Sequence, residues 1–395
     1  MFADLRLPDL DRSAGAAAIG IDVGGTKTAL GLIDAASLTL LATDVIPTGR
    51  ERGGEAVLRD IEKHAAVLAQ AATELGRHIV GLGVAVPEIV NLHGRITSSA
   101  VIPRWNELPV ATVLGAIAPT VVEADVRAAA FAEASLGAGR NYGFHVFLTV
   151  GTGISYCAVG AGRPFAGAHG GALNIGTSVF ALPSEDRTSL DGQLGADDQA
   201  GAGRRIWANG WPSADGQPGG REVVLERVAS GSAIVQRYAA RGGTAQRAED
   251  VLAAARNGDP VASQVVDVAA EALGIGIALL VNLLDPEAVV TGGGLGSADT
   301  EYWTAAERWA RHYAHSHAVD TVLTRGQLGP DAGVIGAGLV GLLARHRLRH
   351  RTTNDDDTGR GAIDRDATNR GTGRETTSRG NADRGIPNSS SDKRK

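Results

Sequence analysis

The sequence predicts an α/β protein built as two lobes, and three observations support this. A strand, a glycine turn and a second strand follow one another twice, in residues 19–33 and 146–157. Between them, residues 121–137 read as a strand that runs directly into an alanine-rich helix. After them, residues 277–296 read as a helix, a strand and a glycine turn. Alternating strands and helices are typical of α/β folds, and the spacing of the turns suits two lobes that close on one nucleotide.

The first glycine turn lies in residues 19–33, IGIDVGGTKTALGLI. It is neither a P-loop nor a dinucleotide-binding fingerprint. Adjacent glycines let the backbone adopt conformations that a side chain would forbid, so backbone amides and the Thr26 hydroxyl can approach a phosphate. The alternative is a hairpin without a ligand, on which Lys27 is only a solvated side chain. The candidate phosphate-binding residues are Gly24, Gly25, Thr26, Lys27 and Thr28.

Two further glycine turns follow. Residues 146–157, VFLTVGTGISYC, repeat the design of the first hairpin and predict a second phosphate loop. Residues 277–296, IALLVNLLDPEAVVTGGGLG, predict a helix that Asp285-Pro286 ends, then a short strand and a glycine triplet. Backbone without side chains can lie flat beside an adenine or a ribose. The candidate nucleotide contacts are Gly151, Thr152, Gly153, Gly292, Gly293 and Gly294.

An aspartate marks the junction between strand and helix in residues 121–137, VVEADVRAAAFAEASLG. A carboxylate at such a junction lies at the carboxyl edge of the sheet, where α/β proteins bind their ligands. Asp125 can therefore face a bound ligand. Its structural alternative is a helix N-cap, a position that aspartate fills well.

At this point the chain resembles the ROK family of sugar kinases and repressors, in the superfamily that includes actin and hexokinase. The resemblance covers residues 17–343 and rests on motifs in the family's order: DVGGTKT, GVAVPEIV, ADVRAAAFAE, TVGTGIS, GAHGGALNIG, VASGSAI, LLDPEAVVTGGG and DAGVIGAG. It implies a two-lobed, actin-like ATPase (ribonuclease H-like) fold with mixed sheets and an interdomain cleft. The expected parts are an extension at 1–16, a small lobe at 17–126, a large lobe at 127–346 and a disordered tail at 347–395.

The resemblance also implies roles for two carboxylates. Asp125 matches the family's catalytic aspartate, and Asp22 matches the carboxylate that serves Mg²⁺, usually through water. Phosphoryl transfer to a sugar hydroxyl requires positioning, charge neutralisation and one base to accept the proton, and Asp125 is the candidate base. For Asp22 the alternative is an ordinary buried polar residue that backbone amides satisfy.

One departure from the family concerns zinc. Most ROK kinases hold a structural zinc with a histidine and a cysteine cluster after the sugar-binding loop. Here Thr177 replaces the histidine, and Cys157 is the only cysteine, so a cysteine zinc site is excluded. Asn174 replaces a sugar-binding glutamate, while His169 is expected to be a loop or sugar contact. Residues 178–228 are expected to form a polar excursion whose packing is one candidate brace for the sugar loop.

A second departure concerns the sugar pocket. The family's GPG-type turn is Val86-Pro87-Glu88 in this chain, and Val101 replaces an asparagine that often contacts the sugar. An added carboxylate attracts a cation, which would favour an aminosugar such as kanosamine, known from antibiotic pathways. The alternatives are that Glu88 faces solvent or pairs with Arg104. The substrate-binding candidates are Glu88, Asp125, His169 and Asn174.

Composition indicates a cytoplasmic protein. The single cysteine suits a reducing compartment, and no apolar core of signal-peptide length follows Met1. The longest apolar run, residues 273–284, is shorter than the roughly 20 residues of a membrane span. A net charge of −6 gives no electrostatic case for nucleic acid. In the tail, residues 352–395 are polar and without aromatic residues; their Arg-Gly pairs could suggest RNA contact, but interspersed acids favour a disordered, solvated extension.

The expected function is therefore ATP- and Mg²⁺-dependent phosphorylation of a hexose or aminohexose. The resemblance to the family implies that the 6-hydroxyl is the one phosphorylated. The alternative is a non-catalytic ROK protein that binds sugar or regulates transcription. ROK repressors carry a winged helix before the first hairpin, whereas only residues 1–18 precede it here. The resemblance to the family, whose enzymes are often dimers, leaves a homodimer open.

Overall fold

The computed structural model describes residues 5–182, 221–298, 300–318, 320–344 and 346. The expected tail at 347–395 and residues 183–220 of the expected polar excursion lie outside the described residues. The ends of that excursion are described: Val179–Leu182 (β9) and Arg221–Val224 (β10) pair as an antiparallel ribbon.

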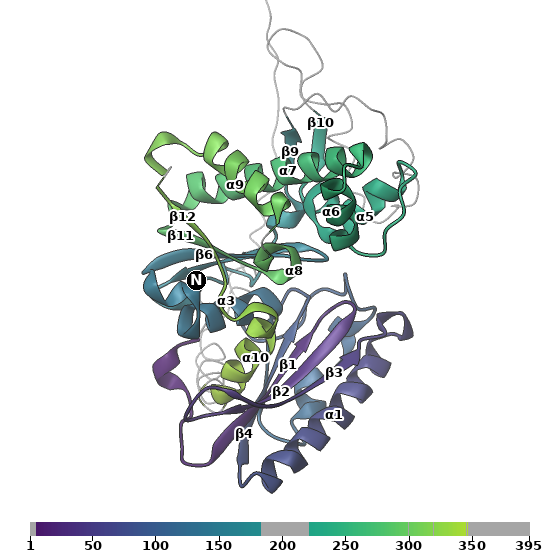
Figure 1. Cartoon of the computed structure of the whole chain (residues 1–395). Coiled ribbons are helices and arrows are strands. Elements are labelled where there is room, and N and C mark those ends of the chain that lie inside the picture. Colours follow the sequence, from purple (N-terminus) through teal and green to yellow (C-terminus); the bar gives the residue numbers. More distant parts are fainter. Residues whose placement is uncertain (1–4, 183–220, 299, 319, 345, 347–395) are drawn as a thin grey trace, which may run out of the picture. The chain divides into compact units, whose positions relative to one another are not determined.

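The first sheet has five strands in the order β3-β2-β1-β4-β5 (Figure 1). The hairpin partners β1 and β2 are antiparallel, as are β2 and β3, whereas β4 lies parallel to β1 and β5 parallel to β4. The sheet is therefore mixed, as expected. Its strands are Ala16–Val23 (β1), Lys27–Asp34 (β2), Leu40–Pro47 (β3), His78–Val86 (β4) and Thr120–Ala124 (β5).

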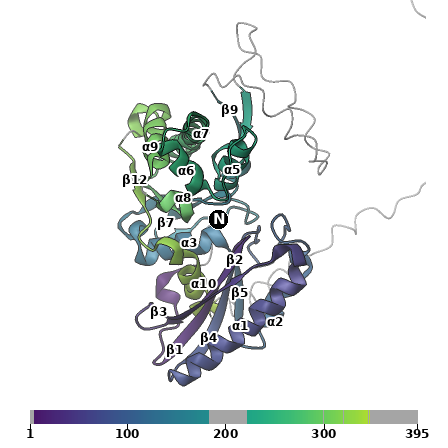
Figure 2. The same cartoon turned by 45° about the vertical axis from the view of Figure 1, so that its right-hand side comes forward.

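Helices cover both faces of this sheet (Figure 2). Ile19 and Ile21 of β1 belong to the same core cluster as Ile61 of the helix α1 (Gly54–Glu74). Gly20 faces the other way, because successive residues of a strand point to opposite faces. There the helix α10 (Ala332–Leu342), from the end of the described chain, packs directly on β1 and β4. The short helix α2 covers Val110–Leu114.

The second sheet repeats this topology. Its order is β12-β11-β6-β7-β8, with β6, β7 and β8 antiparallel in succession and β11 and β12 parallel to β6. The strand order therefore matches the first sheet strand for strand, which agrees with the repeated hairpin design in the sequence. The strands are Phe144–Val150 (β6), Ile154–Gly160 (β7), Arg163–Pro164 (β8), Ala288–Gly292 (β11) and Val322–Arg325 (β12).

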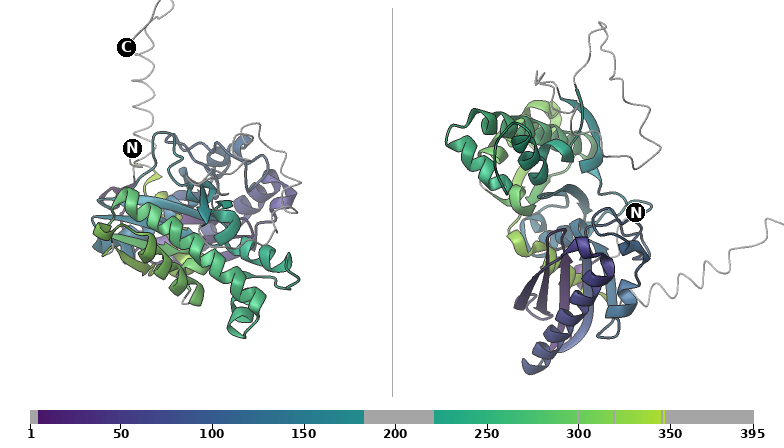
Figure 3. Two further views of the ribbon diagram at one scale, coloured as in Figure 1. Left: turned by 90° about the horizontal axis from the view of Figure 1, so that it is seen from above. Right: turned by 90° about the vertical axis from the view of Figure 1, so that its right-hand side faces the viewer.

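Helices of residues 226–313 share a large apolar core with the second sheet. The same ribbon is seen from two further sides in Figure 3. The long helix α7 packs against α9 and α6, and its buried side chains form much of this core. The helix α3 begins directly after β5 and packs mainly on α10. The helices that follow β5 are Asp125–Leu136 (α3), Glu226–Ala229 (α4), Gly231–Ala239 (α5), Ala248–Arg256 (α6), Pro260–Leu284 (α7), Gly293–Ser297 (α8) and Glu301–Tyr313 (α9).

The helix α7 is longer than its apolar run suggested. It covers 25 residues, and among the described residues it alone is long and apolar enough to cross a membrane, so the expectation that the run is too short is wrong. However, 78% of its most apolar stretch is buried inside the protein, which is the environment of a core helix. Asp285 ends the helix in the left-handed region, with a φ of 48°, as the Asp-Pro pair predicted.

Candidate active site

The first glycine turn joins β1 to β2, and the Gly24 amide donates to the Lys27 carbonyl at 2.9 Å. The expectation that its glycines need special backbone angles is wrong, because neither Gly24 nor Gly25 has a positive φ. Crowding explains Gly24 instead: a Cβ there would lie 2.8 Å from the Lys27 carbonyl oxygen. The Thr48 hydroxyl also donates to the Gly24 carbonyl at 2.7 Å.

Side chains around this turn divide into supporting and exposed groups. Thr28 is buried and its hydroxyl bonds to that of Thr48 at 2.9 Å, so it supports the hairpin. Thr26 and Lys27 are exposed and available to a phosphate. Sequence reasoning missed Arg50, whose Nη1 lies 3.7 Å from the Cβ position of Gly25. Only its basic character after β3 could have drawn attention to it.

Asp22 and Asp125 lie near the carboxyl ends of β1 and β5, which share one edge because β1, β4 and β5 are parallel. Burial, together with the negative charge of Asp22, raises the pKa of Asp125 to about 7, against the hydrogen bond from the Val126 amide. Burial likewise raises the pKa of Asp22 to about 6, opposed by Lys27. The structure therefore brings the two predicted carboxylates together.

The structural alternative for Asp125, a helix N-cap, is wrong. The N-cap residue of α3 is Ala124, and Asp125 is the first helical residue, whose Oδ1 accepts a hydrogen bond from the Val126 amide at 2.6 Å. Asp22 packs against the first turn of α10, where a Cβ on Gly333 would lie 2.2 Å from its Oδ2. The positive end of a helix dipole favours a carboxylate at that place.

The donor set fits Mg²⁺. Carboxylate oxygens are hard ligands, and Mg²⁺ is usually held by one or two of them together with waters and substrate phosphates. Asp22, with Asp125 nearby, supplies such a set. Within the described residues, no group of three or more His, Cys, Asp or Glu side chains is placed to hold a metal unaided. Any Mg²⁺ here would therefore depend on the nucleotide.

The Asp22 carboxyl makes a testable contribution to stability. In metal-free protein, Asp22→Asn is expected to resist urea better than the unmodified protein at pH 8. The folded pKa of about 6 exceeds the unfolded value of 3.8, so ionised Asp22 destabilises the fold above pH 6 and the difference vanishes as pH falls toward 4. Urea midpoints with EDTA at pH 8 and pH 5 check this. A variant less stable than the parent at pH 8 would contradict it.

Glu88 lies buried just after β4. Both of its carboxylate oxygens accept hydrogen bonds from a neighbouring loop. Its Oε2 accepts hydrogen bonds from the Ser98 hydroxyl at 2.5 Å and the Ala100 amide at 2.9 Å. Its Oε1 accepts from the amides of Val101 and Ile102 at 2.8 and 3.0 Å. These four bonds favour a role in supporting the loop over direct contact with an amine.

Both alternatives proposed for Glu88 are wrong. It does not face solvent, and Arg104 pairs with Glu107 and Glu55 instead. The loop that Glu88 supports lies against the first hairpin, since Val101 Cγ1 is 3.4 Å from the Cβ position of Gly25. The charge of Glu88 also contributes to the raised pKa of Asp125. Glu88 is therefore part of the site's surroundings, although not by the chemistry expected.

The second glycine turn joins β6 to β7, and hydrogen bonds to residues 226–232 hold it in place. The Gly151 carbonyl accepts from the Gly231 amide at 2.7 Å, and the Thr152 carbonyl accepts from the Ser232 hydroxyl. Glu226, which sequence reasoning missed, accepts from the Ile154 amide at 2.8 Å. A Cβ on Gly153 would lie 2.7 Å from Glu226 Oε2, so a larger residue there would push the end of this side chain aside.

The glycine triplet meets this second turn. Gly293 has a φ of 79°, and a Cβ there would lie 2.5 Å from the Val150 carbonyl oxygen, so both angle and space require glycine. The Cβ position of Gly151 lies 3.9 Å from the Gly294 amide nitrogen. The predicted nucleotide contacts of the second sheet thus form one cluster at the start of α8.

The expected sugar contacts His169 and Asn174 are exposed in the segment between β8 and the 3₁₀ turn Ile175–Thr177. Thr177, at the position of the family's zinc histidine, donates its hydroxyl to the Asn174 carbonyl at 3.1 Å. Cys157 is buried, and burial raises the pKa of its thiol to about 12. It is therefore an inert core residue.

Comparison with known proteins agrees with this arrangement. The ROK family model matches residues 18–342. The glucokinase of Halalkalibacterium halodurans is 28% identical over 81% of this chain and 93% of its own length. The kanosamine kinase of Amycolatopsis mediterranei is 26% identical over 72% of this chain and 82% of its own.

Among solved structures, a ROK family glucokinase from Streptomyces griseus in complex with glucose and AMPPNP matches with a TM-score of 0.61 and 25% identity. The match covers 82% of this chain and 99% of that one. The expected actin-like ATPase fold with mixed sheets is thereby confirmed. With a family model matched over most of its length and this fold, the chain belongs to the ROK family.

Proposed function

We propose that this chain is a Mg²⁺- and ATP-dependent sugar kinase of the cytoplasm that phosphorylates a hexose hydroxyl. The observation that carries the proposal is the pair of neighbouring carboxylates, Asp22 and Asp125, at the shared edge of β1 and β5. Kinase relatives and a neighbour solved with glucose and AMPPNP support it. Both carboxylates that the reaction needs are present, so the site does not favour the non-catalytic alternative.

Each part of the site has a role in this reaction. Asp125, with a pKa near neutrality, accepts the proton of the sugar hydroxyl as that oxygen attacks the γ-phosphorus of ATP. Bound Mg²⁺ would neutralise charge on the phosphates, and Asp22 would hold it through water. The backbone of the first hairpin, together with Lys27, would contact phosphates. The cluster at Gly151 and the glycine triplet would contact the rest of the nucleotide.

The sugar is proposed as glucose or a related hexose, phosphorylated at the 6-hydroxyl. A kanosamine kinase among the relatives keeps an aminohexose as the second candidate. However, Glu88, the carboxylate expected to attract an amine, already accepts four hydrogen bonds from the neighbouring loop. The structure thus supplies no dedicated amine partner at that position.

ADP release with MgATP tests the proposal on glucose, mannose, glucosamine, N-acetylglucosamine, N-acetylmannosamine and 3-amino-3-deoxyglucose. Turnover on at least one sugar, dependent on Mg²⁺, is the expected result. Phosphate position follows from NMR of the product. Sugar binding without turnover on any member of the panel would favour the non-catalytic alternative.

The pH dependence of the reaction should report Asp125. Because its pKa is raised to about 7, kcat/KM is expected to fall as pH drops below about 7, where the protonated carboxyl cannot accept a proton. Initial rates between pH 5.5 and 9 at constant ionic strength check this. A flat profile from pH 8 to 5.5 would mean that Asp125 is not the titrating base.

A further inference from the structure

A fully buried ion pair flanks the candidate base, with Glu123 two residues before Asp125 and Arg127 two residues after it. The Arg127 and Glu123 side chains are 1% and 3% exposed, and Arg127 Nε donates to Glu123 Oε1 at 2.7 Å. Arginine and glutamate are almost never fully buried unless paired, and burying them needs every polar atom to be satisfied. The rest of the guanidinium group must therefore have partners of its own.

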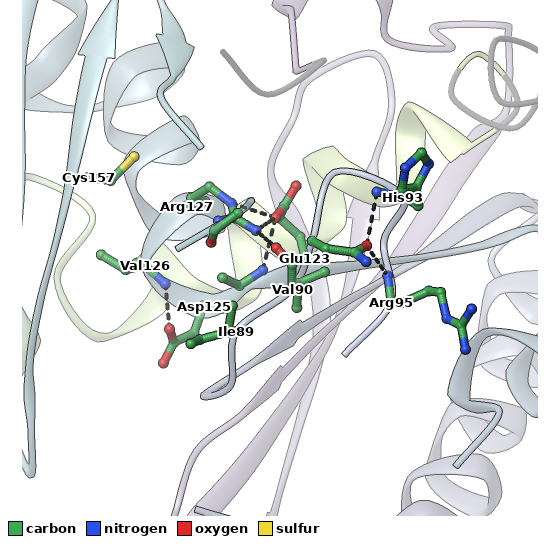
Figure 4. A network of polar contacts seen from close by, with 12 residues as sticks. Ile89, Val90, His93, Arg95, Glu123, Asp125, Val126, Arg127 and Cys157 are labelled. Atoms are coloured by element: carbon green, nitrogen blue, oxygen red, sulfur yellow. Dashed lines mark hydrogen bonds and ion pairs between the residues drawn. The ribbon is translucent and has the colours of Figure 1, made fainter. Parts of the chain in front are cut away.

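Those partners are two carbonyls from distant parts of the chain. Arg127 Nη1 donates to the Gly170 carbonyl at 2.7 Å, and Nη2 donates to the Val90 carbonyl at 2.6 Å. Figure 4 shows Arg127 next to Glu123 and Val90, with Asp125 nearby. Val90 begins the turn after β4, where it bridges to Ile96. One guanidinium group thus joins three segments.

The two carbonyl segments are packed against each other with no spare space. Gly170 has a φ of 81°, and a Cβ there would lie 2.2 Å from the Val90 carbonyl oxygen. Bonds to two acceptors and a carboxylate at once require the planar fork of arginine, whereas a lysine is a point charge that cannot reproduce it. These contacts therefore need an arginine at position 127, and a positive charge alone would not be enough.

Two of the residues joined here, Gly170 and Arg127, lie next to candidate residues of the reaction centre. Gly170 follows His169, the expected sugar contact, and Arg127 is in the first turn of the helix that begins with Asp125. The positive charge of Arg127 also lowers the pKa of Asp125 against the larger effect of burial. With one cysteine in the chain, a cysteine metal clamp cannot hold this loop.

We propose that Arg127 is a positioning residue that fixes the His169 loop and the Val90 turn to the helix carrying Asp125, and so sets sugar binding. The proposal rests on the proposed kinase function and assigns this role to the Glu123–Arg127 pair. It adds a brace among the described residues to the 178–228 segment, which was named above as one candidate.

Arg127→Lys is the principal test, because it keeps the positive charge and loses the fork. The expected result is a sugar KM raised on the order of tenfold or more with the KM for ATP little changed, since a displaced loop misplaces the sugar alone. Hydrogen–deuterium exchange should rise in residues 89–97 and 165–174. The acidic limb of the pH profile should stay in place, as the charge remains.

The double variant Glu123→Gln/Arg127→Met removes both charges and separates charge from geometry. It should show the same loss of sugar affinity, and the acidic limb should move to higher pH because the positive charge near Asp125 is gone. Glu271→Gln is the matched control: this carboxylate is equally buried, on α7, and accepts a bond from the Tyr313 hydroxyl at 3.0 Å. It should leave both KM values and loop exchange unchanged.

Two results would overturn the proposal and are distinguishable from failure of the kinase function. If the parent enzyme turns over and Arg127→Lys keeps its sugar KM, the positioning role is wrong while the kinase stands. If Arg127→Lys lowers the melting temperature and raises the KM for sugar and the KM for ATP together, the pair is only structural. If the parent protein neither binds nor phosphorylates any sugar, the kinase function fails and the positioning role fails with it.

Discussion

Asp125→Asn is expected to reduce kcat by about 10²- to 10⁴-fold, the range that a positioned general base contributes. Asparagine matches aspartate in volume and can still accept the Val126 amide bond that Asp125 Oδ1 makes at 2.6 Å. It cannot accept the proton of the sugar hydroxyl. The loss should therefore lie in kcat, measured as ADP release at saturating MgATP and sugar. Sugar binding, measured by calorimetry, should weaken much less.

Asp267→Asn provides the control for this substitution. It makes the same chemical change at an exposed position on α7. The control should keep the parent kcat, and both variants should keep cooperative unfolding. An Asp125→Asn enzyme that retains more than a tenth of the parent kcat would show that another group accepts the proton.

Local patterns in the sequence were sufficient to predict the elements that carry the site. The glycine turns after β1 and β6 have strands on both sides, and Asp125 follows β5 directly, as the patterns indicated. Such features depend on neighbours within a few residues, where turn chemistry and strand propensity act. The end of α7 at Asp285 likewise depends only on neighbouring residues, the Asp285-Pro286 pair.

Partner choice over long distances could not be predicted. The Glu123–Arg127 pair has helical spacing, which sequence can suggest, but the carbonyls of Val90 and Gly170 are 37 and 43 residues from Arg127. Glu88 similarly bonds to amides 12 to 14 residues away in an irregular loop. The sequence suggested that Glu88 is available to a substrate amine, but in the fold its oxygens accept hydrogen bonds from that loop. Burial and the path of a loop are properties of the folded chain, so the sequence did not reveal them.

The helix α10 is the clearest case of such a long-range feature. Its sequence, AGVIGAGLVGL, is apolar throughout and has no stripe that selects one sheet. It packs on β1 and β4 because glycines face it from those strands: a Cβ on Gly20 would lie 2.2 Å from the Val334 carbonyl oxygen, and one on Gly81 would lie 2.2 Å from that of Gly341. Backbone therefore meets backbone along this contact.

Gly83→Ala is accordingly expected to lower the free energy of unfolding by about 3 kcal/mol or more, the upper range for overpacking. Its Cβ would lie 1.8 Å from the Ala337 carbonyl oxygen and 2.7 Å from the Gly341 amide nitrogen. Backbone atoms cannot rotate away as a side chain can, so α10 has to shift as a unit. Urea unfolding followed by circular dichroism measures the change.

Gly171→Ala is the matched control, since its Cβ would meet nothing within 4 Å and its φ is not positive. Its free energy of unfolding should stay close to that of the parent. Gly83→Ala should also reduce turnover in the molecules that remain folded, because the first turn of α10 holds Gly333 against Asp22. A Gly83→Ala protein as stable as Gly171→Ala would show that α10 does not pack this closely. Retained stability combined with lost turnover would instead mean that the helix moves at little cost and that its position mainly serves Asp22.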